Sequence, residues 1–263
     1  MSLSQTSQPG EEIVNYAYDA TFYQYLQKGA LRSAQIVVPL VMDWLKIKSI
    51  LDVGCGAGAW LSVYQRQGIA ASYGVDGDYV RPESLLIPQA SFIPRDVSQP
   101  FDLGERFDLV QCLEVGEHIP NASSKTLVAN LVKHSDRVLF SAAVPGQGGE
   151  NHINEQTYEF WRAHFAAHGY VPYDFLRPLL RGTDVESWYR YNSVLYIAKD
   201  AQMNLPADIA RTRIPDHAPI PNIAGLPYRL RTRVLAMLPV RWLTRLAVLK
   251  HQSLLLTRKI TGR

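Results

Sequence analysis

The sequence contains only two cysteines, Cys55 and Cys112, among its 263 residues. They are too few for a disulfide framework, and their isolated positions lack the paired spacing of a structural zinc site. This scarcity excludes the small domains that disulfides or zinc hold together. It is typical of a chain that folds in a reducing cytoplasm, where we expect this protein to work.

Long apolar runs are also missing. No window of about 18 residues is apolar and uncharged enough to span a bilayer. The first residues, MSLSQTSQPGEE, are polar and lack the apolar core of a secretory signal. We therefore expect residues 1–12 to form a disordered arm and the chain to carry no membrane-spanning segment.

Acidic residues are scarce at the other end of the chain. Residues 211–263 contain eleven Lys or Arg and a single acid, Asp216, so this segment carries +10 and residues 1–210 carry −7. Five prolines between 201 and 227 predict a linker, and the spacing of apolar and basic residues in 228–263 predicts a basic amphipathic helical tail. Such a tail favours peripheral contact with a membrane surface, with nucleic acid as the less favoured anionic partner.

Strand and helix patterns alternate through the rest of the chain. Strands are predicted at 48–54, 71–76, 90–97, 106–114, 136–144, 171–176 and 193–199, and helices at 57–68, 121–135 and 154–169. Residues 15–45 have a helical pattern that Gly29 is expected to divide in two. No helix is expected between the last two strands, which predicts an antiparallel hairpin at one edge.

This order predicts an α/β domain over residues 13–200. Its core is a seven-stranded, mostly parallel sheet with helices on both faces and an antiparallel last strand.

A glycine-rich turn follows the first strand. In ILDVGCGAG, Asp52 precedes Gly54, Gly56 and Gly58, and the turn opens a helix, where α/β folds bind ligands. The spacing G-x-G-x-G differs from the G-x-G-x-x-G of dinucleotide-binding dehydrogenases, which need their third glycine one position later. A dehydrogenase is the alternative interpretation of this turn.

This turn closely resembles the first motif of class I S-adenosylmethionine-dependent methyltransferases, which have a Rossmann-like fold. The resemblance covers residues 49–145 well and extends to 17–199 by element order. It implies that the turn, including Cys55, holds the methionine part of the cofactor. Asp76, with Gly77 beside it, is expected to bind the ribose hydroxyls, and Asp96 the adenine amino group. Val97 and Leu113 complete the expected cofactor residues.

Three ionisable residues follow the fourth strand in LEVGEHIP: Glu114, Glu117 and His118. A turn there would let them converge, and His152 follows the fifth strand at the same edge of the sheet. Two carboxylates and two imidazoles suit Mg²⁺ or another divalent metal. The pattern resembles the metal site of the small-RNA 3′-end ribose methyltransferases and of ubiquinone-pathway O-methyltransferases. Without a metal, His118 is the expected general base, and Glu117 orients the loop.

These observations predict S-adenosylmethionine-dependent O-methylation of a small hydroxylated molecule or a saccharide. Divalent-metal assistance is part of that expectation. Two alternatives remain open at this point: RNA ribose 2′-O-methylation, and a catalytically silent cofactor-binding scaffold that works through its tail.

Overall fold

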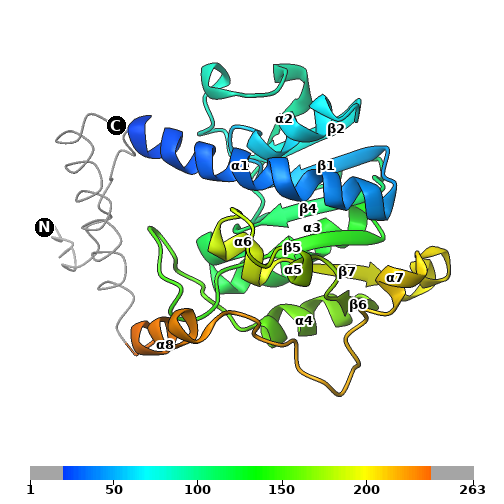
Figure 1. Cartoon of the computed structure of the whole chain (residues 1–263). Coiled ribbons are helices and arrows are strands. Elements are labelled where there is room, and N and C mark those ends of the chain that lie inside the picture. Colours follow the sequence, from blue (N-terminus) through cyan, green and yellow to red (C-terminus); the bar gives the residue numbers. More distant parts are fainter. Residues whose placement is uncertain (1–19, 238–263) are drawn as a thin grey trace, which may run out of the picture.

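A seven-stranded sheet forms the centre of the computed structural model, which describes residues 20–237 (Figure 1). The strands are β1 (Ser49–Val53), β2 (Ala71–Asp76), β3 (Phe92–Pro94), β4 (Leu109–Leu113), β5 (Arg137–Ser141), β6 (Tyr170–Tyr173) and β7 (Val194–Ala198). Their order is β3-β2-β1-β4-β5-β7-β6, and only β7 runs antiparallel to its neighbours. The predicted mostly parallel sheet with an antiparallel last strand is confirmed.

Helices cover both faces of this sheet, as predicted. They are α1 (Ala20–Leu45), α2 (Ala59–Arg66), α3 (Ser124–His134), α4 (Tyr158–Ala166), α5 (Leu176–Leu179), α6 (Ser187–Asn192), α7 (Ala207–Ala210) and α8 (Leu226–Leu235). Residues of α1, α2 and α5 share one apolar core with the sheet, whereas α3 and α4 share another core on the opposite face.

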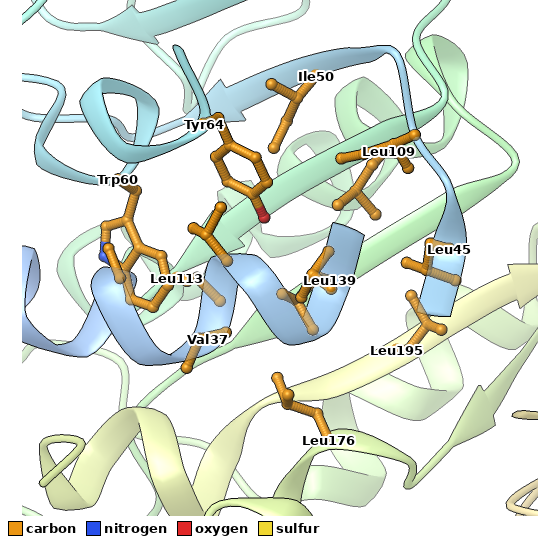
Figure 2. Packing of buried hydrophobic residues seen from close by; sticks show 14 of the residues in the cluster. Val37, Leu45, Ile50, Trp60, Tyr64, Leu109, Leu113, Leu139, Leu176 and Leu195 are labelled. Atoms are coloured by element: carbon orange, nitrogen blue, oxygen red, sulfur yellow. The ribbon is translucent and has the colours of Figure 1, made fainter. Parts of the chain in front are cut away.

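The alternation of side chains along each strand divides the strand residues between these two cores. In β1, Ile50 belongs to the α1 side and Leu51 to the α3 side, and both are fully buried. Figure 2 shows the α1 side, where side chains of α1, α2 and α5 meet the sheet. The labelled residues are Val37 and Leu45 of α1, Trp60 and Tyr64 of α2, Leu176 of α5, and Ile50, Leu109, Leu113, Leu139 and Leu195 of the strands.

The division of residues 15–45 at Gly29 is wrong, because α1 runs without interruption from Ala20 to Leu45. Gly29 serves a close approach instead of a break. A Cβ there would lie 2.9 Å from the Glu186 carboxylate, so the missing side chain leaves room for that group. The helix also contains Pro39, whose cost the buried apolar face of α1 offsets.

The expectation of no helix between the last two strands is also wrong. The strands β6 and β7 do pair antiparallel, from Tyr170↔Ala198 to Tyr173↔Leu195, but α5 and α6 lie between them in sequence. Of the two, β6 forms the edge, and β7 lies between β5 and β6. The helices are too short, at four and six residues, for a 3.6-residue periodicity to be recognised.

Residues 201–227, predicted as a linker, pack along the domain where the structure describes them. Ile214 and Ile220 are buried in the α3-side core, and the Ile214 amide donates to the Pro172 carbonyl oxygen at 2.9 Å. The predicted arm (1–12) and residues 238–263 of the predicted tail lie outside the described residues. Within the described part, no helix has the length and apolarity needed to cross a bilayer.

Candidate functional site

The glycine turn between β1 and α2 has a backbone conformation with positive φ angles, which glycine adopts without steric cost. Gly54, Gly56 and Gly58 have φ angles of 80°, 54° and 82°. A Cβ on Gly54 would lie 2.2 Å from a methyl carbon of Val115, so the turn also passes very close to the segment after β4. The Gly54 amide donates to the Val75 carbonyl oxygen at 2.7 Å, which fixes the turn against the end of β2.

Asp76, the last residue of β2, lies against this turn. One carboxylate oxygen accepts from the Gly56 amide at 2.6 Å, and the other from the Gly77 amide at 2.7 Å and from the Tyr79 hydroxyl. The side chain is buried, with 5% of its surface exposed. Its oxygens are thus held at the carboxyl edge of the sheet, where a carboxylate can accept two adjacent hydroxyl groups.

A cavity of about 770 Å³ opens at this edge. Seven of the residues predicted as cofactor or metal ligands line it: Gly54, Asp76, Gly77, Asp96, Val97, Glu114 and His118. This volume is in the usual range for small-molecule sites. Asp96 is tied to its own loop, because one carboxylate oxygen accepts from the Ser98 amide at 2.9 Å and from the Ser98 hydroxyl at 2.7 Å.

The remaining predicted cofactor residues, Asp52, Cys55, Gly56, Gly58 and Leu113, are not among the described residues that line the cavity. Asp52 is buried beneath the turn, and one of its oxygens has no hydrogen-bond partner among the described residues. Burial raises the pKa of Asp52 to about 7; the Gln111 amide opposes this rise, and Asp76 adds to it. Burial likewise raises the pKa of the Cys55 thiol, which disfavours a reactive thiolate.

The segment after β4 turns sharply. Glu114 has a φ of 56°, and residues Gly116–His118 form one turn of 3₁₀ helix, so the expected turn is present. The Glu114 carboxylate accepts from the Gln147 amide at 2.7 Å and from the Asn192 amide at 3.3 Å. These two amides hold Glu114 toward the α6 side of the site.

Three of the four predicted metal ligands come together. Ligand atoms of Glu117, His118 and His152 all lie within 4.8 Å of one another, and Glu114 does not belong to this group. The two imidazole rings meet edge to face, with centroids 4.9 Å apart. Glu117 is fully buried, and neither of its carboxylate oxygens has a hydrogen-bond partner among the described residues.

Burial and charge act on these groups together. Burial raises the pKa of Glu117 well above its ordinary value, and the nearby Glu114 carboxylate raises it further. Although part of His118 is exposed, shielding of its ring from water lowers its pKa to about 4, and His152 lowers it further. The cluster thus favours a neutral imidazole, the form that binds metals, and a carboxyl group whose charge needs a compensating cation.

Sequence reasoning missed Glu155, which organises this cluster. Its carboxylate accepts from the amides of Gly146 and Gly148, both at 2.7 Å, and contacts His152 Nδ1 at 2.9 Å. A proton on Nδ1 leaves the lone pair of His152 on Nε2. The spacing His-x-x-Glu was the available signal, because a carboxylate that orients a ligating histidine is a common arrangement.

Sequence reasoning also missed Gln147 and the two side chains that donate to it, Asn192 and Tyr228. The Gln147 side-chain oxygen accepts from the Asn192 amide at 2.8 Å and from the Tyr228 hydroxyl at 3.3 Å. Tyr228 lies on α8, eighty-one residues from Gln147, and its ring packs on Tyr191 with centroids 5.0 Å apart. No local pattern could have placed α8 beside this site.

Comparisons with known proteins agree with this geometry. A family described as "Methyltransferase domain" matches residues 24–174. A comparison with curated proteins found no match. Among solved structures, the chain is similar to DesVI from Streptomyces venezuelae, with 17% identity, coverage of 68% of this chain and 97% of that chain, and a TM-score of 0.50. It is also similar to the sugar N-methyltransferase KedS8 from a Streptoalloteichus species, with 16% identity, coverage of 75% and 98%, and a TM-score of 0.51. At these identities, the two structures show a shared fold.

Proposed function

The chain belongs to the S-adenosylmethionine-dependent methyltransferase domain family, and from this premise we propose that it methylates a hydroxyl oxygen of a small molecule or saccharide. One observation carries the proposal. The fully buried Glu117 carboxylate, without a hydrogen-bond partner among the described residues, lies beside two imidazoles in the segment that lines the cofactor cavity. Such a group is costly to bury unless a cation or a polar substrate engages it.

The donor set of Glu117, His118 and His152 fits a divalent cation. One carboxylate and two neutral imidazoles suit Mn²⁺, Fe²⁺ or Zn²⁺, and Mg²⁺ if water supplies further oxygen ligands. The groups that contact the other nitrogen of each imidazole also fit. Glu155 orients His152, and the Asn151 carbonyl oxygen lies 3.3 Å from His118 Nδ1. When bound, the cation would supply a Lewis acid that favours the ionised form of an acceptor hydroxyl.

The residues of the chain supply the remaining steps. In our proposal, the glycine turn and Asp76 would hold the cofactor, and the acceptor would lie at the end of β4. The bound cofactor would supply the methyl group: the acceptor oxygen would bond to the methyl carbon as the carbon–sulfur bond breaks, and the sulfur would leave with the electron pair. The hydroxyl proton must pass to a base. Without a cation, His118 takes it at Nε2, because Nδ1 faces the Asn151 carbonyl oxygen.

A saccharide acceptor is supported by two features. Glu114 and His118 line the cavity next to the end of β4, and these polar side chains can bind the hydroxyl groups of an acceptor. A solved structure with the same fold is a sugar methyltransferase, although its printed name specifies nitrogen as the acceptor atom. Our preference for oxygen rests on the cluster, since an amine does not need a Lewis acid to become nucleophilic.

Turnover of the cofactor tests the metal. We expect the purified protein to form demethylated cofactor with polyhydroxylated acceptors, to lose this activity with a chelator, and to regain it with one divalent metal. Glu117→Gln and His152→Gln should lose metal binding, measured by calorimetry with Mn²⁺ alone, and retain binding of the demethylated cofactor. His168→Gln, at an exposed histidine outside the cluster, is the matched control.

The choice of acceptor is tested separately. Matched sugars that carry either a hydroxyl or an amino group at one carbon should show methylation of the hydroxyl form by mass spectrometry. Methylation of the amine alone would overturn the oxygen assignment, and methylation of RNA ends alone would overturn the small-molecule assignment. Cofactor binding without transfer to any of these acceptors would favour a silent scaffold.

A further inference from the structure

The helix α8 has an exposed apolar stripe along one side. The stripe consists of Leu226, Leu230 and Val234 on the helix and Met237 two residues after it. These side chains are exposed, with between 51% and 85% of the residue surface accessible. These residues recur at three- and four-residue spacing, so they share one side of the helix. Exposed apolar residues aligned in this way indicate an interaction surface.

Arginines flank this α8 stripe. An α-helix turns about 100° per residue, so Arg229 and Arg233 border one side of the stripe and Arg231 borders the other. Residues 226–263 contain nine Lys or Arg and no acidic residue. The described helix is therefore the first part of a longer stretch in which apolar and basic residues alternate.

The opposite side of α8 is attached to the functional site. Tyr228 donates to Gln147, and Thr232 is buried. A Cβ on Gly146 would lie 1.9 Å from the Thr232 carbonyl oxygen, so the helix backbone packs directly on the loop that precedes His152. Figure 1 shows α8 beside this loop. The α8 stripe consequently faces away from the loop.

We propose that α8 docks on an anionic lipid surface through the α8 stripe and its flanking arginines. A row of Leu, Val and Met bordered by Arg matches the interface of a bilayer, where apolar side chains enter the acyl boundary and arginines contact phosphate headgroups. Nucleic acid offers no apolar surface for the stripe. A second copy of the helix would bring like charges together. Docking in this way places the loop that precedes His152 close to the lipid surface.

Vesicle binding tests this proposal without any acceptor or cofactor. We expect the full chain to sediment with vesicles of equal phosphatidylglycerol and phosphatidylcholine, and to remain in the supernatant with phosphatidylcholine alone. Leu230→Ser with Val234→Ser should abolish sedimentation. Arg229→Gln with Arg233→Gln should weaken it by about fivefold per arginine, and added salt should weaken it further.

Matched controls use exposed residues away from α8. Met203→Ser removes another exposed apolar side chain, and Arg181→Gln with Arg211→Gln removes the same charge as the arginine pair. These variants should sediment like the unaltered chain. Binding of demethylated cofactor by every variant shows that the domain is folded.

Three results would overturn the proposal. Absence of sedimentation with the anionic vesicles, or sedimentation that the α8 variants leave unchanged, would show that α8 makes no lipid contact. A dimer in light scattering that Leu230→Ser with Val234→Ser converts to a monomer would assign the stripe to a second copy. RNA binding lost in the arginine variants, without vesicle binding, would assign the surface to nucleic acid. None of these results depends on the proposed transfer to oxygen, so the two proposals fail independently.

Discussion

The buried carboxyl group of Asp52 makes the stability of the folded protein depend on pH. Its pKa in the folded protein is raised from 3.8 to about 7, chiefly by burial. The folded state therefore holds this proton more tightly than the unfolded state does. The free energy of unfolding should therefore fall as pH rises from 3.8 to about 7, because the unfolded carboxyl group ionises first.

We expect Asp52→Asn to flatten this pH dependence. The test is chemical denaturation of both proteins at a series of pH values from 3.8 to about 7. Glu117 also has a raised pKa and acts in the same direction in both proteins, so the difference between them isolates Asp52. Parallel curves for the two proteins would show that the pKa of Asp52 does not differ between the folded and unfolded states.

Gly54 is the residue at which the glycine turn tolerates a side chain least. We expect Gly54→Ala to lose binding of demethylated cofactor and about 1–3 kcal/mol of stability, because the new Cβ would clash with Val115 at a φ of 80°. Gly68→Ala is the control: its φ is 94°, but in the described part of the chain no atom lies within 4 Å of the new Cβ. Calorimetry and denaturation should separate the clash from the backbone strain, and equal losses in both variants would contradict this account.

Sequence alone predicted the residues of the cavity better than those that support it. Asp76 ends β2, and Asp96 and His118 lie within five residues of the ends of β3 and β4, so strand order places them at one edge of the sheet. Glu155 and Gln147 act through a glycine-rich loop whose path depends on φ angles that no periodicity reveals. The separation of Glu114 from the cluster was equally hidden, because it follows from contacts with Gln147 and Asn192.

At the scale of elements, local breaker residues were weaker guides than packing. Gly29 and Pro39 both lie inside α1, because the helix buries an apolar face along the sheet that outweighs their local cost. The long, strongly periodic elements were predicted within a few residues. The short helices α5 and α6 were not, since tertiary contacts rather than periodicity define them.

The contact between α8 and the loop before His152 gives a prediction about an element. Gly146→Ala should separate α8 from this loop, because the new Cβ would meet the helix backbone 1.9 Å away. We expect faster tryptic cleavage at the arginines of α8 and faster amide exchange in residues 226–235. Gly148→Ala, with a φ of 71° and no atom of residues 20–237 within 4 Å of the new Cβ, should leave both rates unchanged. Similar rates in both variants would show that α8 is held elsewhere.

At the scale of the whole molecule, one buried guanidinium joins distant segments. Arg177 is fully buried, pairs with Asp174 at 2.7 Å, and donates to the carbonyl oxygens of Tyr191 and Pro221. It thereby connects α5, the end of α6 and the segment predicted as a linker. Loss of the guanidinium would leave Asp174 and two carbonyl groups without these partners.

We therefore expect Arg177→Met to cost about 3–5 kcal/mol of stability, the range for breaking a buried ion pair. Denaturation with urea gives the measurement. Arg211→Met is the control, because Arg211 and its partner Asp208 are exposed, and such pairs contribute about 0–1 kcal/mol. A small loss at Arg177 would mean that water replaces the guanidinium and that the joined segments are held by apolar packing alone.

The position of β7 has a consequence for synthesis on the ribosome. This strand ends at Ala198, yet it lies between β5 and β6, which precede it in the chain. The growing polypeptide can assemble β1 to β5 as soon as they emerge, but β6 has no neighbour to pair with until β7 has left the exit tunnel. Nascent chains that stall before this point should expose the unpaired edge of β5 and recruit chaperones, whereas chains stalled well after it should not.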